Sequence, residues 1–346
     1  MTLKPAPPQN ASKQLFRRVV WPLAAVAFLL LINLILNPGF YTLEFVDGEV
    51  KGAVISALRL SVYIMLPALG MCLVIATRGV DLSVGTVAAI GAAVTAWACT
   101  STDGGSAVAL SVAGVLGAGL LCGLFNGMVI SKFGIQPIVA TLAFMVAGRG
   151  IARLIMGNTI QLHYEHPTLD WLGNGALLGL PTIVWVGALI AGLLLLLVRG
   201  TALGMLIEAT GDNPQAARLV GVPVARVLLL VYVLAAVLSA IAGLLWSGEY
   251  HYAHAVEAGK YWELDAIMAV VIGGTMLTGG RFTLLGTILG ALLIQLLTQM
   301  LMAMGVDSAV TPLYKGVIVL AICLIQAPAI RQSIADYLQR RRELPA

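Results

Sequence analysis

Residues 181–198 read PTIVWVGALIAGLLLLLV and contain no charged side chain. The hydrocarbon layer of a bilayer is about 30 Å thick, and a helix needs roughly 20 mostly apolar residues to cross it. A helix satisfies its own backbone hydrogen bonds, so such segments can repeat in lipid where an open sheet cannot. Similar blocks recur along the chain, one at residues 21–36 with only Asn33 as a polar interruption. The pattern predicts an all-α protein that spans the membrane many times.

The composition supports a membrane protein and argues against other classes. The 346 residues are 60% hydrophobic and 10% charged, whereas soluble domains carry about 25% charged residues. The net charge of +4 comes from scattered Lys and Arg residues, not from the basic patch that nucleic-acid binding requires. We expect no nucleic-acid partner.

The chain lacks the motifs of self-contained catalysis. No Gly-x-x-x-x-Gly-Lys-Ser/Thr loop is present to hold the phosphates of ATP. No His-Glu-x-x-His zinc helix and no plausible Ser-His-Asp set occurs. The four cysteines lie in apolar runs without metal-ligand spacing, and the two His-x-x-His pairs lack a third ligand. We expect no enzymatic activity, no catalytic residue and no metal site in this chain.

The apolar segments predict about ten transmembrane helices. Gly residues and Pro67 interrupt the second, third and eighth, which we expect to be broken helices that line a cavity or pack against neighbours. This organisation gives a cytoplasmic N-terminal tail at 1–18, one membrane domain at 19–328 and a cytoplasmic C-terminal tail at 329–346. The predicted spans are 19–37, 54–77, 83–100, 106–130, 137–157, 181–198, 227–248, 264–279, 284–304 and 312–328.

The basic residues indicate which ends of the helices face the cytoplasm. An even number of spans places both termini on one side, and the positive-inside rule assigns connections rich in Lys and Arg to the cytoplasm. With cytoplasmic termini, the outer segments hold only Lys51, Lys260 and Lys315. The inner segments then hold Lys4, Lys13, Arg17, Arg18, Arg78, Lys132, Arg199, Arg218, Arg226, Arg281, Arg331, Arg340, Arg341 and Arg342.

Three glycines in the fourth predicted span recur at every fourth position. Gly119, Gly123 and Gly127 leave one helix face without side chains. A neighbouring backbone can therefore approach that face closely. We expect this neighbour to be another helix of the same chain.

The longest inner connection, residues 199–226, predicts two short helices joined by a tight turn. Residues 205–210 predict a short helix that ends at Gly211, the residue type common after a helix C-terminus. Asp212 or Asn213 can cap a second short helix, which begins with a proline. A rigid turn of this kind fits the groove of a partner protein, and it is also explained as a compact connection between two spans.

The same loop resembles the coupling-helix loop of permease subunits in the ribose-type family of ABC sugar importers. Residues 207–218, IEATGDNPQAAR, carry this resemblance. One departure is Arg78, because members of the family usually have a small residue at that position. Further matching stretches are 75–85 (IATRGVDLSVG), 135–142 (IQPIVATL), 263–275 and 279–287.

The resemblance implies a membrane subunit of an ATP-driven importer that carries a monosaccharide across the bacterial inner membrane. Its implied partners are a cytoplasmic ABC ATPase, a periplasmic sugar-binding protein and a second permease chain, the same or different, that completes the pore. ATP and Mg²⁺ would be bound by the ATPase, and this chain would hold no cofactor. The implied coupling residues are Glu208, Ala209, Thr210, Gly211, Asp212, Asn213, Ala216 and Ala217.

Some stretches point to one branch of this family. Residues 144–150, 167–171 and 201–205 are most similar to permeases of galactofuranose importers. The resemblance therefore implies galactofuranose as the sugar, and a second, different permease chain in the pore.

Several polar residues in or beside the spans are candidates for the sugar pathway or for support of the helices. An unpaired Arg such as Arg149 costs about 2.5–3.5 kcal/mol at mid-bilayer on insertion scales, so it should face protein or water. Asp81 can cap the third span, and acidic residues at the start of the eighth favour its N-terminus. The candidates are Asn126, Gln136, Thr141, Arg149, Asp81, Ser83, Glu263 and Asp265.

The outer segments are acidic. Carboxylates there can pair with basic residues of a docked binding protein, or they form an ordinary solvated rim. These residues are Glu44, Asp47, Glu49, Glu165, Asp170, Glu249 and Glu257.

A self-contained secondary transporter driven by H⁺ or Na⁺ is the alternative function. Stretches 73–94 and 267–293 share Gly-rich turns followed by Gly/Ala-rich spans, and repeated halves are typical of such carriers. However, coupled carriers commonly need a carboxylate near the middle of a span, and the predicted spans contain none there.

Overall fold

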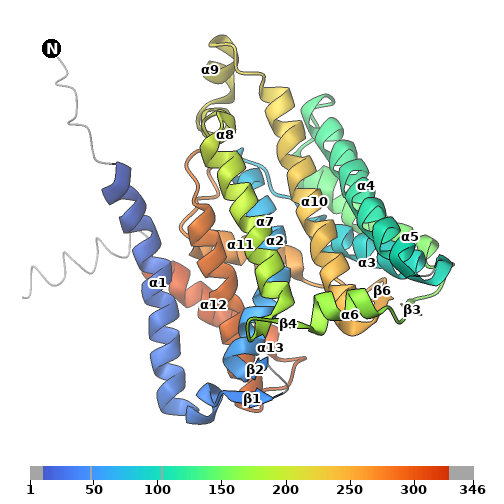
Figure 1. The fold of residues 1–346 in the computed structure, drawn as a ribbon. Helices are drawn as coiled ribbons and strands as arrows, with labels where there is room; N and C mark the ends of the chain where they lie inside the picture. Colours follow the sequence, from blue (N-terminus) through green and yellow to red (C-terminus); the bar gives the residue numbers. More distant parts are fainter. Residues whose placement is uncertain (1–10, 47–48, 103, 327–346) are drawn as a thin grey trace, which may run out of the picture.

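The computed structural model describes residues 11–46, 49–102 and 104–326. In this part of the chain, helices form an elongated bundle, and three small antiparallel sheets lie toward one end of it (Figure 1). Two short helices, α8 and α9, lie at the opposite end. The tail residues 1–10 and 327–346 fall outside this description, as do residues 47–48, which include Asp47, and residue 103.

Seven of the described helices are long and apolar enough to cross a bilayer. They are α2 (Ala53–Ala76), α3 (Val84–Ser101), α4 (Gly104–Ser131), α5 (Pro137–Ile155), α7 (Thr182–Gly200), α10 (Val224–Tyr250) and α12 (Leu284–Ala303). Two further helices with shorter apolar parts are α1 (Ala11–Leu36) and α13 (Thr311–Gln326).

The remaining elements are short. The helices are η1 (Pro38–Tyr41), α6 (Pro167–Asn174), α8 (Leu203–Asp212), α9 (Pro214–Leu219) and α11 (Trp262–Ile272). The strand pairs are β1 (Glu44–Val46) with β2 (Glu49–Lys51), β3 (Gln161–His163) with β6 (Tyr252–His254), and β4 (Ala176–Leu177) with β5 (Leu180–Pro181).

The predicted spans coincide with these helices except at two places. The first helix begins at Ala11, several residues before the predicted start at 19. The eighth predicted span, 264–279, is wrong at its end, because α11 stops at Ile272. Eleven residues at 1.5 Å each give a helix of only about 16 Å, too short to cross a bilayer.

Glycine chemistry explains why α11 stops. Gly274 has φ +84°, a left-handed conformation that favours glycine. The Gly274 N–H donates to the Val271 carbonyl at 3.0 Å, and the Thr275 N–H donates to the Val270 carbonyl at 3.2 Å. This pair of bonds is a Schellman motif, which closes the C-terminus of a helix.

The predicted interruption of the second and third spans is also wrong. The helix α2 continues through Pro67, and α3 is unbroken. Their glycines serve packing instead: a Cβ on Gly70 would lie 2.5 Å from the Cα of Ala235, and one on Gly91 would lie 2.2 Å from the Ala240 carbonyl oxygen. Both neighbours belong to α10, so α10 packs directly on the two helices.

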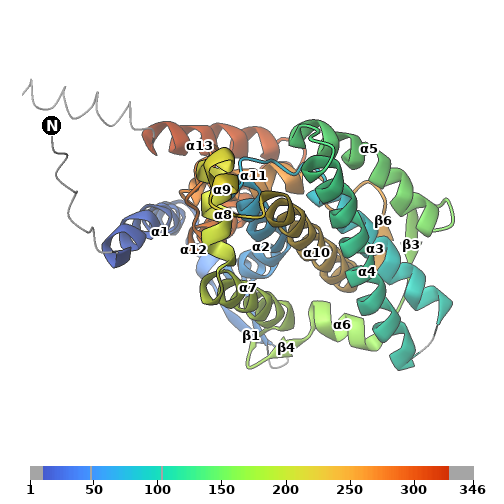
Figure 2. The same cartoon turned by 90° about the horizontal axis from the view of Figure 1, so that it is seen from above.

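The bare face of α4 packs on α10, as predicted. A Cβ on Gly119, Gly123 or Gly127 would lie 2.8, 2.5 or 3.1 Å from a Cα of α10. Figure 2 shows α2 inside a ring made by α7, α10, α11 and α12. The helix α2 is therefore largely buried within the chain.

Two connections fold back against the last turns of α2. Residues 77–83 join α2 to α3, and the Asp81 nitrogen lies 3.5 Å from the sulfur of Met71. Residues 273–283 join α11 to α12, and the Thr275 hydroxyl lies 3.7 Å from the Cys72 sulfur. We call these connections the first and second turn; both lie beside the end of α2 that faces α8.

The glycine packing gives a stability prediction. Replacing Gly123 by Ala places a methyl group against the α10 backbone, and such overpacking costs about 1–3 kcal/mol. Gly117 of the same helix has open space around its Cβ position, so Gly117→Ala should be neutral or should stabilise the helix by up to about 1 kcal/mol. Thermal unfolding of the purified chain in detergent measures both variants. Equal melting temperatures would contradict the packing.

Candidate functional site

The short helix α8 lies against the end of α2 and both turns. We call this contact the α8 junction and define it by Ala76 and Arg78 near the end of α2, Gly211 and Asp212 of α8, and Gly280 of the second turn. The Gly280 N–H donates to the Ala76 carbonyl at 2.8 Å. One backbone carbonyl therefore holds the second turn onto α2.

Gly211 brings α8 against this same carbonyl. A Cβ at Gly211 would lie 1.8 Å from the Ala76 oxygen and 2.5 Å from the Gly280 nitrogen. Both atoms belong to backbone, which cannot move aside cheaply. Only glycine fits at this position, and the contact joins three segments far apart in the sequence.

The boundaries of the two short helices differ from the prediction. Gly211 is buried within α8, which ends at Asp212, so its assignment as the residue that stops the helix is wrong. The choice between two caps resolves to Asn213, whose Oδ1 accepts from the N–H groups of Gln215 and Ala216, both at 3.0 Å. The side chain thus satisfies two N–H groups of the first turn of α9.

The predicted coupling residues divide between inward and outward positions. Thr210, Gly211 and Ala217 are buried against their own chain, and Glu208 and Ala209 are half-buried. The exposed residues are Asp212, Asn213 and Ala216. Glu208 makes no hydrogen bond or ion pair with the described part of the chain, so its carboxylate remains available to a partner.

The exposed surface of α8 and α9 also carries apolar side chains that were not predicted from the sequence. Met205, Leu219 and Val220 are 71, 89 and 80% exposed. In a chain that is 60% hydrophobic, such residues give no contrast in the sequence. Their exposure on a polar connection makes this surface a candidate for binding a partner.

Four of the predicted polar residues meet in one buried cluster at the first turn. The Ser83 hydroxyl donates to Asp81 Oδ1 at 2.5 Å and accepts from the Asn126 amide at 2.9 Å. The Thr141 hydroxyl accepts from the Leu82 N–H at 3.1 Å. These bonds tie the first turn to α4 and α5, while Asp81 binds the Ser83 N–H just before the start of α3.

Gln136 and Arg149 lie apart from this cluster. Gln136 is exposed and precedes α5. The Arg149 guanidinium donates to the carbonyls of Ala255, Ala258 and Gly259. Carbonyl oxygens therefore satisfy this charge, and Arg149 fixes the connection between β6 and α11.

Glu263 and Asp265 both lie in the first turn of α11, as predicted, but their partners differ. The Asp265 carboxylate pairs with Lys315 of α13 at 2.7 Å. The Glu263 Oε2 atom is buried and has no hydrogen-bond partner. The Lys315 side chain is only 12% exposed and lies near the start of α13, so the carboxylate of Asp265 and not solvent surrounds its charge.

Glu249 lies buried near the end of α10, which corrects its predicted role. It was assigned to the acidic docking surface, yet it is 8% exposed. Its carboxylate pairs with Arg59 of α2 at 2.9 Å and accepts from the Tyr63 hydroxyl. Arg59 and Tyr63 were not predicted as partners of Glu249, because nothing in the local sequence indicates a contact between residues so far apart in the chain.

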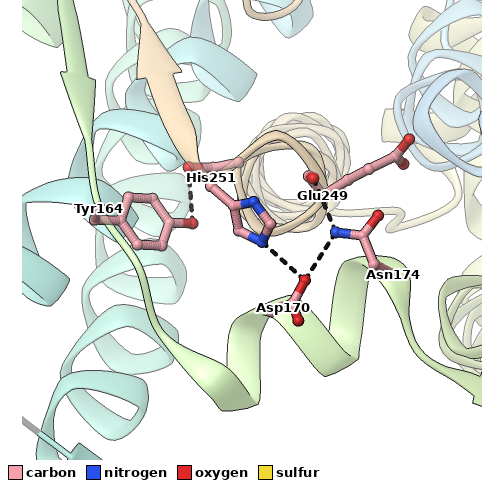
Figure 3. A network of polar contacts seen from close by, with 6 residues as sticks. Tyr164, Asp170, Asn174, Glu249 and His251 are labelled. Carbon is pink, nitrogen blue, oxygen red and sulfur yellow. Dashed lines mark hydrogen bonds and ion pairs between the residues drawn. The ribbon is translucent and has the colours of Figure 1, made fainter.

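A surface network joins α6 to the end of α10 (Figure 3). Asp170 accepts from the Asn174 amide at 3.0 Å and pairs with His251 at 2.8 Å. Asn174 also donates to the Glu249 carbonyl at 3.0 Å. The Asn174 amide and the imidazole hold the pKa of the Asp170 carboxyl below its ordinary value. In the described residues, no three His, Cys, Asp or Glu side chains gather as a metal site would require.

Comparison with known proteins gives a consistent picture. Residues 53–327 match the family model described as branched-chain amino acid transport system / permease component. The galactofuranose transporter permease of Escherichia coli K12 is 42% identical over 90% of this chain and 92% of its own length. The fructose import permease of Bifidobacterium longum is 38% identical over 96 and 94%, and the ribose import permease of E. coli K12 is 34% identical over 87 and 91%. No solved structure matches the chain.

The buried pair of Asp265 and Lys315 predicts a coupled loss of stability. Lys315→Met leaves an unpaired buried carboxylate and should cost roughly 3–5 kcal/mol, whereas Lys315→Met combined with Asp265→Leu should cost less. Unfolding of the purified chain by titration with a denaturing detergent measures each variant. Lys51→Met, which removes an exposed lysine, is the control. Additive losses in the double variant would show that the two charges do not interact.

Proposed function

This chain belongs to the family of branched-chain amino acid transport system permease components and is a multi-pass membrane protein, and we propose that it is the permease subunit of an ATP-driven ABC sugar importer. The observation that carries the proposal is the α8 junction. A short helix with exposed apolar residues rests on two turns that lead into the membrane helices. A partner that moves this helix would move those turns.

The named relatives support a sugar as the substrate. The family description mentions amino acids, but the relatives reported above import galactofuranose, fructose and ribose. We propose a monosaccharide, with galactofuranose first because that relative has the highest identity of the three. Of the candidate pathway residues, Gln136 is exposed and would offer a neutral hydrogen-bonding group to its hydroxyls, whereas Asn126 and Thr141 are buried and would support the helices around the pathway.

We propose ten membrane crossings with both termini in the cytoplasm. Seven are the long helices, and α1 and α13 add two more. The tenth is α11 completed by the second turn. Irregular backbone is tolerated at membrane depth where protein covers it, and the second turn packs on α2 and α12.

The proposed partners follow from this arrangement. A cytoplasmic ABC ATPase would bind α8 and α9, where Met205, Leu219 and Val220 offer apolar contacts and Glu208 offers a carboxylate. ATP and Mg²⁺ would be held by that ATPase, and this chain would have no ATPase site. A sugar-binding protein would dock at the opposite end, and a second permease chain would complete the pore.

The junction explains how hydrolysis in a separate protein can change the membrane helices. Because Gly211 contacts the backbones of both α2 and the second turn, α8 cannot move toward them without displacing at least one of them. The first turn is hydrogen-bonded to α4 and α5, and the second leads into α12. Cycles of ATP binding and hydrolysis would favour the inward- and outward-facing states in turn.

The first test is transport by the assembled importer. Gly211→Ala should separate α8 from the junction, since the added methyl group has no space, and ATP-driven sugar uptake in proteoliposomes should fall roughly tenfold given an overpacking cost of about 1–3 kcal/mol. Gly200→Ala, at a position with open space, should leave uptake unchanged. Ion-driven sugar uptake by the lone chain would instead identify a secondary transporter and overturn the proposal.

The second test concerns the ATPase surface and the orientation. Purified ATPase should bind inside-out vesicles that contain the permease, and should not bind right-side-out vesicles. Leu219→Asp should weaken this binding roughly tenfold, as expected for an exposed apolar anchor. Leu178→Asp is the matched control, because Leu178 is 85% exposed and directly follows β4, which lies at the opposite end of the bundle from α8 (Figure 1). Binding to right-side-out vesicles alone would reverse the proposed orientation.

A further inference from the structure

Arg78 has an unusual conformation for its residue type. Its φ is +66°, in the left-handed region that glycine adopts freely and other residues rarely do. The resemblance noted above leads us to expect a small residue here. A long cation held in a conformation that glycine would adopt more easily needs a compensating interaction.

The Arg78 side chain makes that interaction with α8. Its guanidinium donates to the carbonyl oxygen of Asp212, the last residue of α8. The final carbonyls of a helix lack partners within the helix, and a cation beside them is favoured by the helix dipole. The side chain is exposed, so this bond, and not burial, accounts for its position.

The second turn lies against the aliphatic part of the same side chain. A Cβ on Gly279 would lie 2.4 Å from Arg78 Cγ. The stem therefore passes over Gly279 to reach Asp212. Glycine at position 279 leaves the space that the arginine occupies.

The bond differs in kind from the Gly211 contact. Van der Waals contact between Gly211 and Ala76 resists compression, so it can transmit a push but little pull. A hydrogen bond also resists separation. In the described part of the chain, the bond from Arg78 to Asp212 is the only one that joins α8 to an element other than its immediate neighbours in sequence.

The backbone of Arg78 leads directly into the buried polar cluster. Asp81 and Ser83 follow within five residues, and they connect to Asn126 of α4. Leu82 connects to Thr141 of α5. Tension applied at the guanidinium would therefore reach helices α3, α4 and α5.

We propose that Arg78 is a tether that pulls the first turn when α8 moves away from the membrane helices. It is a positioning residue, since it acts through α8 and touches neither sugar nor nucleotide. The proposal rests on the proposed function in one respect, that an ATPase moves α8. Without the tether, ATP hydrolysis would continue and α8 would still move, but part of this movement would no longer reach the membrane helices.

Three variants separate the tether from a general structural role. Arg78→Gly removes the donor and also relieves the left-handed backbone, so the chain should still fold. Arg78→Lys keeps a cation with a different donor geometry and should give intermediate values. Arg281→Gly is the matched control, because it removes an exposed arginine of the second turn that makes no hydrogen bond or ion pair with the described residues.

Two measurements are made on each variant. The first is hydrogen exchange of the α8 backbone amides in the permease chain alone, in nanodiscs. Arg78→Gly should accelerate exchange at residues 209–213 roughly two- to fivefold, the factor expected for loss of a cation at a helix C-terminus. The second is the number of ATP molecules hydrolysed per sugar imported by the assembled transporter, which should rise above the wild-type ratio.

The outcomes are distinct. Unchanged exchange in Arg78→Gly relative to Arg281→Gly would overturn the tether. Faster exchange with a wild-type ratio of ATP to sugar would also overturn it, because α8 would then be loosened without a loss of coupling. If the wild-type assembly shows no ATP-driven uptake, the proposed function fails, and the exchange measurement alone decides whether Arg78 holds α8.

Discussion

The carbonyl oxygen of Ala76 is the point on which the α8 end of the molecule depends. It accepts the Gly280 N–H and lies against Gly211. Two segments, α8 and the second turn, thus approach one atom of α2 through glycines. Any larger residue at position 211 would push α8 away from α2, so glycine there is a steric requirement. The same principle joins α4 to α10, where three glycines let two backbones approach.

Helix positions could be predicted from the sequence because the length of an apolar block is a local property. The bounds of α2, α4 and α12 follow from such blocks. The end of α11 could also have been found, since the Gly273–Gly274 pair marks a helix stop, but hydropathy concealed it. Apolar residues beyond the pair extended the predicted span to residue 279.

The partners of the charged residues could not be predicted, because they depend on contacts between distant segments. Glu249 reads as an outer carboxylate from its position, yet Arg59 and Tyr63 of α2 enclose it. Lys315 likewise reads as an outer cation and pairs with Asp265. The buried polar cluster was found only as separate candidates, since its members come from the first turn, α4 and α5. The residue types identified the candidates, and only the fold showed which residues they contact.

The two turns also change the meaning of a pattern in the sequence. Stretches 73–94 and 267–293 resemble each other, and repeated halves are typical of secondary transporters. In the structure, each stretch supplies one of the turns beside the end of α2, and α8 contacts the first turn through Arg78 and the second through Gly211. A repeat used in this way provides two points of attachment for one short helix. The similarity is therefore explained by a binding site for a separate ATPase as well as by an ion-coupled carrier. The exposed apolar residues on α8 and α9 favour the ATPase, because a self-contained carrier has no need of them.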